Sequence, residues 1–387
     1  MRSLDVSQGT IIGIDQLIIG STAACDLLDL DGQVAIPTGS PITPNLLAEI
    51  KSAGVVALLP KRSDFSTHHM STGKPGLTAI ASRIGEMQRR SGIINPLTSP
   101  TCDLARKTVS DTVAAVSSGK LPDIDGLNLV IDRILHDTEL LQTPPLPCPS
   151  GDSDCAVDRI IDSALDMAVL MSWHLRRDGV AESCVRASTL GALLHDIGLA
   201  QIKPSILDSP ETLSQCDVRE IRRHPYLGLR SITALGDKIP QDARDIILMH
   251  HENDDGSGYP LHRSGGKIPR VAQLARILDS YIALVSHRPH RASVSPHQAI
   301  EILMRGSGKT YNGDILGQFI KRTGRYPLGS AVILSNNEIG VVVGMGSGSP
   351  FKPVVDVYFS NRQKFQETPQ RVDLGRDHLK YIRQVMR

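Results

Sequence analysis

The stretch that decides how this chain folds lies between residues 193 and 281, where apolar runs repeatedly end in histidine or aspartate. It opens with LLHDIG (193–198), continues through RRHPYLG (222–228) and MHHENDDGSGYP (249–260), and closes with ARILDSYIAL (275–284). Six polar residues lie at the ends or on the inner faces of these predicted helices: His195, Asp196, His224, His250, His251 and Asp279. A buried carboxylate or imidazole without a partner is costly. We therefore expect one common neutraliser, and a pair of metal ions would supply it.

Asp279 shows most clearly why these residues predict ligands. In the predicted helix at 269–286, Asp279 follows Val271 and Ala275 at intervals of four residues, so it shares their buried apolar face. The adjacent pair His195-Asp196 ends a helix that is apolar nearly all round. At such an end an imidazole can bind one ion, while a carboxylate can bridge two. The pattern favours a metal site over a structural role.

A glycine-containing loop and a basic cluster adjoin these helices. DDGSGYP (254–260) predicts a tight turn, because Gly256 and Gly258 permit backbone conformations closed to other residues. SHRPHRAS (286–293) places Arg288 and Arg291 just beyond the last helix, and arginines beside a metal cluster suit an anionic phosphate. GSGKT (306–310) is not a phosphate-binding P-loop, because that motif needs a glycine where Leu303 stands.

The composition is that of an ordinary globular protein. The 387 residues suffice for two or three domains, and a formal net charge of +1 gives no argument for a general DNA, RNA or membrane surface. The six cysteines lack a CxxC spacing, and no secretory signal is recognisable, so we expect reduced thiols in the cytoplasm. No apolar run approaches the ~18 residues of a membrane span.

Turn signals and apolar runs divide the chain into four segments. Residues 1–100 predict a small α+β module, with a hairpin candidate at Asp31-Gly32 and a helix from Thr43. Residues 101–154 predict a helical and Pro-rich linker, because four prolines lie at 143–154. The metal-binding helices occupy 155–325. Residues 326–387 predict a β-rich extension, with a hairpin at Asn336-Asn337, a third strand at 350–359 and a closing helix at 373–386.

The remaining histidines and acids of the helical region have simpler explanations. His136 lies on the polar side of its predicted helix and is expected to be solvated. His174 is expected to be packed or on the surface rather than to bind metal. Asp162 and Asp166 are four residues apart and therefore share a helix face. An exposed acidic edge near the helix N-terminus is favoured over ligation for this pair.

Together these motifs resemble the HD-GYP proteins, a branch of the HD phosphohydrolase superfamily associated with hydrolysis of cyclic di-GMP. The resemblance covers residues 155–325 through LLHDIG, RRHPYLG, HHENDDGSGYP and the segment 265–291. It implies a mainly α fold, an HD-type helical bundle, here with a small α+β N-terminal module and a small β-rich C-terminal tail. It also implies a role in bacterial second-messenger signalling. The partners to expect are cyclic di-GMP, diguanylate cyclase-type signalling proteins at the DGSGYP loop, and a second copy of the chain.

The resemblance implies two divalent ions, most commonly iron or manganese. Their ligands would be, for one ion, His195, Asp196 and Asp279 and, for the other, Asp196, His224, His250 and His251. Asp196 would bridge both ions at the catalytic centre, where activated water would attack phosphorus in line. A family histidine of the first site is replaced by Ser163, and a family glutamate by Arg159. The first site is therefore expected to be weak or empty, unless Asp162 or Asp166 swings in.

The resemblance also assigns substrate contacts. Phosphate would be held by Arg288 and Arg291, and the pocket would be bordered by Gly256, Tyr259 and Pro260. Two family residues are missing here: a lysine after the HD pair corresponds to Leu199, and a tyrosine of the basic segment corresponds to His290. The loss of the lysine falls on chemistry rather than on packing, so it bears on activity.

Three functions are compatible with these residues. The retained ligands and the complete DGSGYP loop favour a metal-dependent phosphodiesterase acting on cyclic di-GMP. Ser163 and Leu199 favour a weakly active or inactive HD-GYP protein that binds nucleotide or a partner protein as an effector. A phosphohydrolase acting on a mononucleotide is the third, and the DGSGYP segment disfavours it. We expect the phosphodiesterase.

Overall fold

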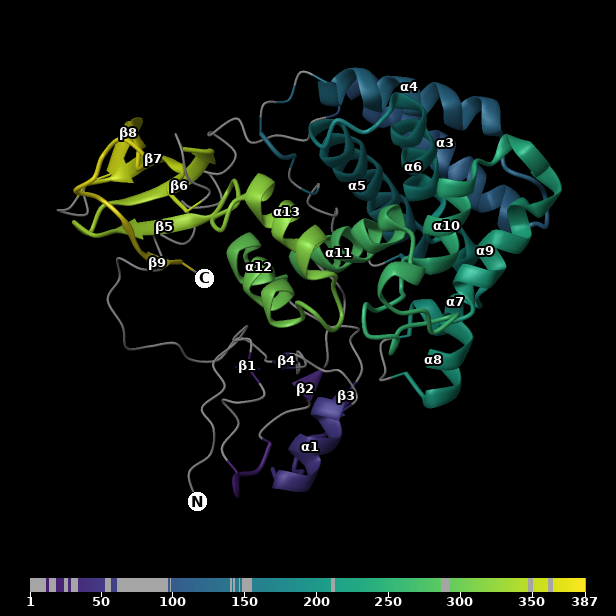
Figure 1. Ribbon diagram of the computed structural model, residues 1–387, viewed down its shortest axis with the longest axis horizontal. Helices are drawn as coiled ribbons and strands as arrows, with labels where there is room; N and C mark the ends of the chain where they lie inside the picture. Colours follow the sequence, from purple (N-terminus) through teal and green to yellow (C-terminus); the bar gives the residue numbers. More distant parts are fainter. Residues whose placement is uncertain are drawn as a thin grey trace.

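Helices form the centre of the protein, and a small antiparallel sheet precedes and another follows them in the chain (Figure 1). The computed structural model describes residues 12–13, 19–23, 27–28, 34–52, 57–60, 97, 99–139, 141, 143–145, 147, 155–209, 213–286, 293–346, 351–360 and 365–386. Within this described part, no helix is long and apolar enough to cross a membrane. The predicted fold class, a helical bundle with small β-containing parts on both sides, is confirmed.

The bundle has one continuous apolar core. Its main helices are α5 (Ala156–Arg177), α6 (Glu182–Leu194), α9 (His224–Ile232), α10 (Gln241–Met249), α11 (Arg270–Val285), α12 (Pro296–Arg305) and α13 (Gly313–Thr323). Short elements connect them: η2 (Ile197–Gln201), α7 (Pro204–Leu207), α8 (Gln215–Ile221), η3 (Thr233–Lys238) and η4 (Gly265–Lys267). α5 packs against α6 and α11, and α10 packs against α6. Leu170, Leu193, Ile246 and Ile277 are fully buried where these helices meet, which stabilises the arrangement by the hydrophobic effect.

Polar side chains fix where several helices begin. At α12, Ser295 and Gln298 form a capping box, in which each side chain bonds the backbone N–H of the other. At α13, the side chain of Asn312 accepts hydrogen bonds from the first backbone N–H groups. At α5, the carboxylate of Asp208 accepts a 2.7 Å hydrogen bond from the N–H of Ala156. These bonds satisfy donors that a helix start would otherwise leave unpaired.

Residues 101–154 do not stand apart from the bundle as the predicted linker would. They contain α3 (Ser99–Ser117) and α4 (Ile124–Glu139), and both helices pack against α5. Ala105, Val109, Leu127 and Ile131 are at most 2% exposed and belong to the same core as the bundle helices. Two amphipathic helices can bury their apolar faces only against a neighbour. We therefore propose that the helical domain begins near residue 99. His136 is exposed on α4, as expected.

The N-terminal module is confirmed as a small α+β unit. Its strands β1 (Ile12–Gly13), β2 (Leu27–Leu28), β3 (Val34–Ile36) and β4 (Ala57–Pro60) form an antiparallel sheet in the order β1-β4-β2-β3. The helix expected from Thr43 is α1 (Pro44–Ser52), and the Thr43 hydroxyl accepts a 3.2 Å hydrogen bond from the N–H of Leu46. β2 pairs with β3, whereas the hairpin turn predicted at Asp31-Gly32 lies outside the described residues.

The C-terminal extension is a five-stranded antiparallel sheet. Its strands β5 (Ala331–Leu334), β6 (Ile339–Gly344), β7 (Val354–Phe359), β8 (Phe365–Asp373) and β9 (Ile382–Val385) have the order β8-β7-β6-β5-β9. The β5–β6 hairpin around Asn337 and the third strand are confirmed. The closing helix predicted at 373–386 is wrong, because residues 382–385 form β9 against β5. Asp373 and Asp377 accept hydrogen bonds from the N–H groups of Gly375 and Leu379, which makes turns instead of a helix.

Candidate metal centre

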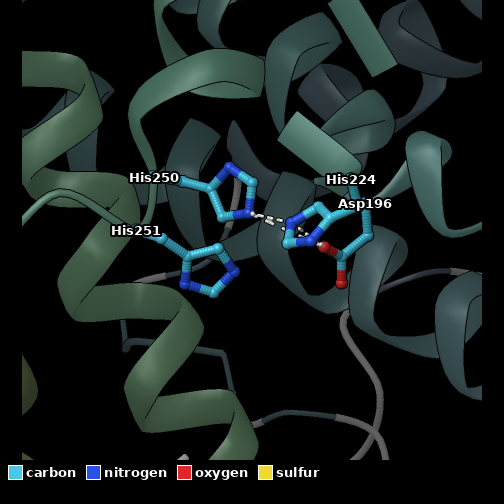
Figure 2. Close-up of side chains that lie close together, drawn as sticks. All are labelled: Asp196, His224, His250 and His251. Atoms are coloured by element: carbon cyan, nitrogen blue, oxygen red, sulfur yellow. Dashed lines mark hydrogen bonds and ion pairs between the residues drawn. The ribbon is translucent and has the colours of Figure 1, made fainter. Parts of the chain in front are cut away.

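Four of the six predicted ligands converge at one point of the bundle. Side-chain donor atoms of Asp196, His224, His250 and His251 all lie within 4.8 Å of one another. Asp196 follows the end of α6, His224 is the first residue of α9, and the two adjacent histidines follow α10. Figure 2 shows the three imidazole rings and the carboxylate facing a common space. Packing of α6, α9 and α10 in one core thus brings together residues that are distant in sequence.

Backbone carbonyl groups fix the protonation of the ring nitrogens. The Nδ1 atoms of His195, His224 and His250 lie 2.8, 2.9 and 3.0 Å from carbonyl oxygens three or four residues earlier. A carbonyl can only accept, so each Nδ1 must carry the proton. In its neutral form each of these rings would therefore present the lone pair at Nε2. The Nε2 atoms of His224 and His250 lie 3.1 Å apart. Two lone pairs at this distance repel unless a cation lies between them.

The Asp196 carboxylate completes this donor set. One of its oxygens lies 3.2 Å from His224 Nε2 and 3.6 Å from His250 Nε2. Metal-binding histidines characteristically donate their second ring N–H to a carbonyl or carboxylate, as the rings do here. Imidazole with carboxylate suits transition metals rather than calcium or magnesium. The residues present therefore fit a divalent transition metal.

The electrostatics of the centre keep most of its donors unprotonated. Burial lowers the pKa of His224 to about 4, although Asp196 opposes this shift. Burial, with neighbouring imidazoles, also holds the pKa of His251 well below its usual value. Burial also disfavours charge on Asp196 and His195. The attraction between the two groups and the hydrogen bonds around them together outweigh this effect. They hold the pKa of Asp196 well below the ordinary range and raise the pKa of His195 to about 9. The carboxylate is thus ionised and two imidazoles are neutral at pH 7.

The other two predicted ligands border this four-donor set. His195 Nε2 lies 3.3 Å from the second oxygen of Asp196 and has no hydrogen-bond partner among the described residues. Asp279 on α11 lies 3.8 Å from His251 Nδ1 and 3.9 Å from the Arg276 guanidinium. Both are close enough to share Asp196 and the cluster with a second ion. Their role as ligands stays a prediction.

The acidic pair on α5 differs from the expectation. Asp162 and Asp166 are 8% and 7% exposed, so the predicted exposed acidic edge is wrong. Asp162 forms an ion pair with Arg106 of α3, which covers this face of α5. One of the two residues that could swing toward the first ion site, Asp162, is therefore already engaged. Ser163 beside it is partly buried on the same helix.

Two of the other three replaced family positions, Arg159 and Leu199, have structural roles. The Arg159 guanidinium donates a 2.8 Å hydrogen bond to the carbonyl of Leu207 and pairs with Asp208 at 3.3 Å, which fastens α5 to α7. Leu199 packs against the bundle core as a partly buried side chain. Arg288, His290 and Arg291 lie outside the described residues. The Arg159 guanidinium is thus engaged with the segment at α7, and Leu199 offers the centre no metal-binding or phosphate-binding group.

Glu252 anchors the loop that follows the two adjacent histidines, and sequence reasoning missed it. It is 1% exposed, and its carboxylate accepts hydrogen bonds of 2.6 and 3.1 Å from the N–H groups of Leu261 and Arg263. The loop is tight, since a Cβ at Gly258 would lie 2.6 Å from the Cα of Glu252. Within the loop, the Tyr259 ring stacks on His251 with centroids 4.7 Å apart. The available sequence signal for this anchor was a glutamate directly after the HH pair that ends an apolar helix.

Helix α11 and the GSGKT segment hold the same loop from the other side. Arg276 is 8% exposed, and its Nε donates a 3.1 Å hydrogen bond to the side chain of Asn253. The Asp254 carboxylate accepts from the side chain of Gln273 at 3.3 Å, and its N–H donates to the carbonyl of Thr310 at 3.2 Å. GSGKT is thus a support for the DGSGYP loop. An arginine three residues before Asp279 in an apolar helix could have indicated the contact.

Comparison with known proteins agrees with this site. The family model described as HD domain matches residues 160–315. A cyclic di-GMP phosphodiesterase of Pseudomonas aeruginosa is 32% identical over 210 residues, covering 54% of this chain and 50% of the relative. A cyclic di-GMP phosphodiesterase of Thermotoga maritima is 32% identical over 143 residues, covering 37% and 39%. A 3′3′-cGAMP-specific phosphodiesterase of Vibrio cholerae is 31% identical over 133 residues, covering 34% and 26%.

The matched region coincides with the helices that carry the centre. The chain spans half or less of the length of each of these relatives. The match begins within α5 and ends within α13, so it includes His195, His224, His250 and every other member of the predicted ligand set. The resemblance found in the sequence motifs is confirmed: the chain carries an HD domain and is an HD-GYP domain protein.

Proposed function

We propose that this protein is a metal-dependent phosphodiesterase that hydrolyses cyclic di-GMP. The observation that carries the proposal is the convergence of the Asp196 carboxylate with imidazole nitrogens of His224, His250 and His251. Two of the relatives described above are named cyclic di-GMP phosphodiesterases, and the HD domain model matches the region that contains this donor set. A donor set of this kind in an HD domain supports phosphodiester hydrolysis.

The proposed centre holds divalent iron or manganese. Asp196, His224, His250 and His251 would hold one ion, and His195 and Asp279 would share Asp196 with a second, weaker one, since Ser163 contributes no imidazole. The ions supply Lewis acidity for in-line attack of water on phosphorus. Asp196 is the proposed catalytic residue, because it faces both positions and stays ionised.

The remaining roles are assigned around that centre. Arg288 and Arg291 are proposed to hold phosphate. The loop with Gly256, Tyr259 and Pro260 is proposed to border the pocket, which its contact with His251 supports. Signalling proteins of the diguanylate cyclase type are proposed to contact this loop, in which Asp255 and Ser257 are exposed. A homodimer is proposed as the assembly.

The second candidate is an effector that binds nucleotide with little or no hydrolysis. The pairing of Asp162 with Arg106 favours it, because that pairing removes one candidate replacement for the missing ligand. The competing substrates to test are 3′3′-cGAMP and a mononucleotide phosphate ester.

Purified protein, reconstituted anaerobically with iron or manganese, separates these candidates. Cyclic di-GMP, 3′3′-cGAMP and a mononucleotide ester are offered separately, and metal content is determined on the same sample. Hydrolysis of cyclic di-GMP in preference to the other two supports the proposal. Tight binding of cyclic di-GMP without turnover, at one ion per chain or fewer, would assign the effector role instead.

A further inference from the structure

Arg222 lies at the edge of the metal centre. Its guanidinium has no polar partner in the described part of the chain. Arg222 caps the C-terminal end of α8, two residues before His224, and its side chain is exposed. Its neighbours are engaged: Arg223 pairs with Glu220 at 2.7 Å, and Arg219 donates to the carbonyl of Gln215 at 3.3 Å. Among the described residues, the one electrostatic contact of the Arg222 guanidinium is a cation–π interaction with an aromatic ring.

That ring ties Arg222 to the metal centre. The guanidinium carbon lies 5.3 Å from the centroid of Tyr259, and Tyr259 stacks on His251 at an interplanar angle of 20°. The ring of His224 meets the same tyrosine edge-on at 6.3 Å. A cation over an aromatic face is attracted by its quadrupole, so the contact gives the exposed side chain a preferred direction. The Tyr259 ring thus contacts both Arg222 and two members of the donor cluster, His224 and His251.

No carboxylate of the described residues forms an ion pair with this guanidinium. Glu220 is held by Arg223 through both carboxylate oxygens, at 3.0 and 2.7 Å. Glu252 is buried and accepts from the backbone of Leu261 and Arg263. A planar guanidinium with uncommitted N–H donors matches the oxygens of a phosphate in a bidentate way.

We propose that Arg222 binds a non-bridging phosphate oxygen of the substrate beside the metal centre. The proposal deepens the proposed phosphodiesterase function and rests on it for the identity of the substrate. A solvated surface arginine held only by Tyr259 is the alternative. The two differ in whether removing the guanidinium weakens phosphate binding without weakening metal binding.

The test compares Arg222→Gln and Arg222→Lys with Arg219→Gln in the full-length, manganese-loaded protein. Arg219 is the matched control, because it is an exposed arginine of the same short helix whose loss leaves no carboxylate unpaired. Inorganic phosphate binding is measured by calorimetry, followed by KM and kcat for cyclic di-GMP. Manganese affinity is measured by chelator competition.

Arg222→Gln is expected to weaken phosphate binding and raise KM by about tenfold, as for loss of a charge-assisted hydrogen bond, with kcat changed less than about twofold. Arg222→Lys should restore part of the affinity, and Arg219→Gln should behave as wild type. Manganese should bind Arg222→Gln no more weakly than wild type.

Three results would overturn the proposal. They are equal phosphate affinity in Arg222→Gln and Arg219→Gln, a parallel loss of manganese affinity, and no phosphate binding by wild type. The second result would show that Arg222 acts through Tyr259 and His251. If cyclic di-GMP is not hydrolysed but phosphate binding still depends on Arg222, only the proposed substrate fails.

Discussion

Replacing Glu252 by glutamine tests how the DGSGYP loop is held. The carboxylate is 1% exposed and accepts from two backbone N–H groups, those of Leu261 at 2.6 Å and Arg263 at 3.1 Å. Glutamine keeps the shape but has a single acceptor oxygen, so its NH2 group faces one of these donors. Loss of a charge-assisted bond and an unsatisfied buried N–H should together cost about 2–3 kcal/mol.

Urea unfolding measures the change in the free energy of unfolding. Glu220→Gln is the control, because Glu220 lies in an exposed ion pair worth about 0–1 kcal/mol. Amide hydrogen exchange of Leu261 and Arg263 should also accelerate in the Glu252→Gln variant, ahead of exchange in the core helices. A loss no larger than that of the Glu220 variant, with unchanged exchange at both amides, would refute the anchoring role of Glu252.

Three further predictions concern packing and charge. Gly198→Ala should displace α9 and lower metal content strongly, because its Cβ would lie 2.8 Å from the carbonyl carbon of His224; wild-type metal content would contradict this. Arg106→Ala should lower the free energy of unfolding by about 1–3 kcal/mol, since Asp162 is left buried without its partner, and urea unfolding checks it. Burial lowers the pKa of His174 to about 3, so below its unfolded pKa near 6.5 only the unfolded state binds the proton. The stability that His174 contributes is therefore fully present above pH 6.5 and is lost at about 1.4 kcal/mol per pH unit toward pH 3, and His174→Phe should reduce the fall of urea midpoints between pH 7 and 5.

The donor cluster was predictable because its signals are local in the sequence. A histidine or aspartate that ends an apolar helix, or that shares its apolar face as Asp279 does, must be buried when that helix packs. Burial without a partner is costly, so several such residues in one core imply a shared cation. His174 could be distinguished from them, and it packs against Trp173 and Phe319 as expected.

The contacts that support the centre could not be predicted in the same way. Glu252 and Arg276 bind groups of a loop whose course is set only after the helices have packed. Asp162 was predicted to lie on a solvated edge because it is near the N-terminus of its helix. Its partner Arg106 lies on α3, which was expected to be part of a linker. The closing helix failed because Asp373 and Asp377 compete for backbone N–H groups through their side chains.

The most direct measurement is cyclic di-GMP turnover together with metal content in wild type, Asp196→Asn and His136→Ala. His136 is the control, because it is an exposed histidine of α4 outside the cluster. We predict turnover in wild type and His136→Ala with at least one ion per chain. Mutating a residue that only hydrogen-bonds a metal ligand typically lowers metal affinity by about 10 to 100-fold. In Asp196→Asn the loss of metal affinity should be larger, and turnover should fall with it. Undiminished turnover in Asp196→Asn, or none in metal-loaded wild type, would contradict a catalytic metal centre at this cluster.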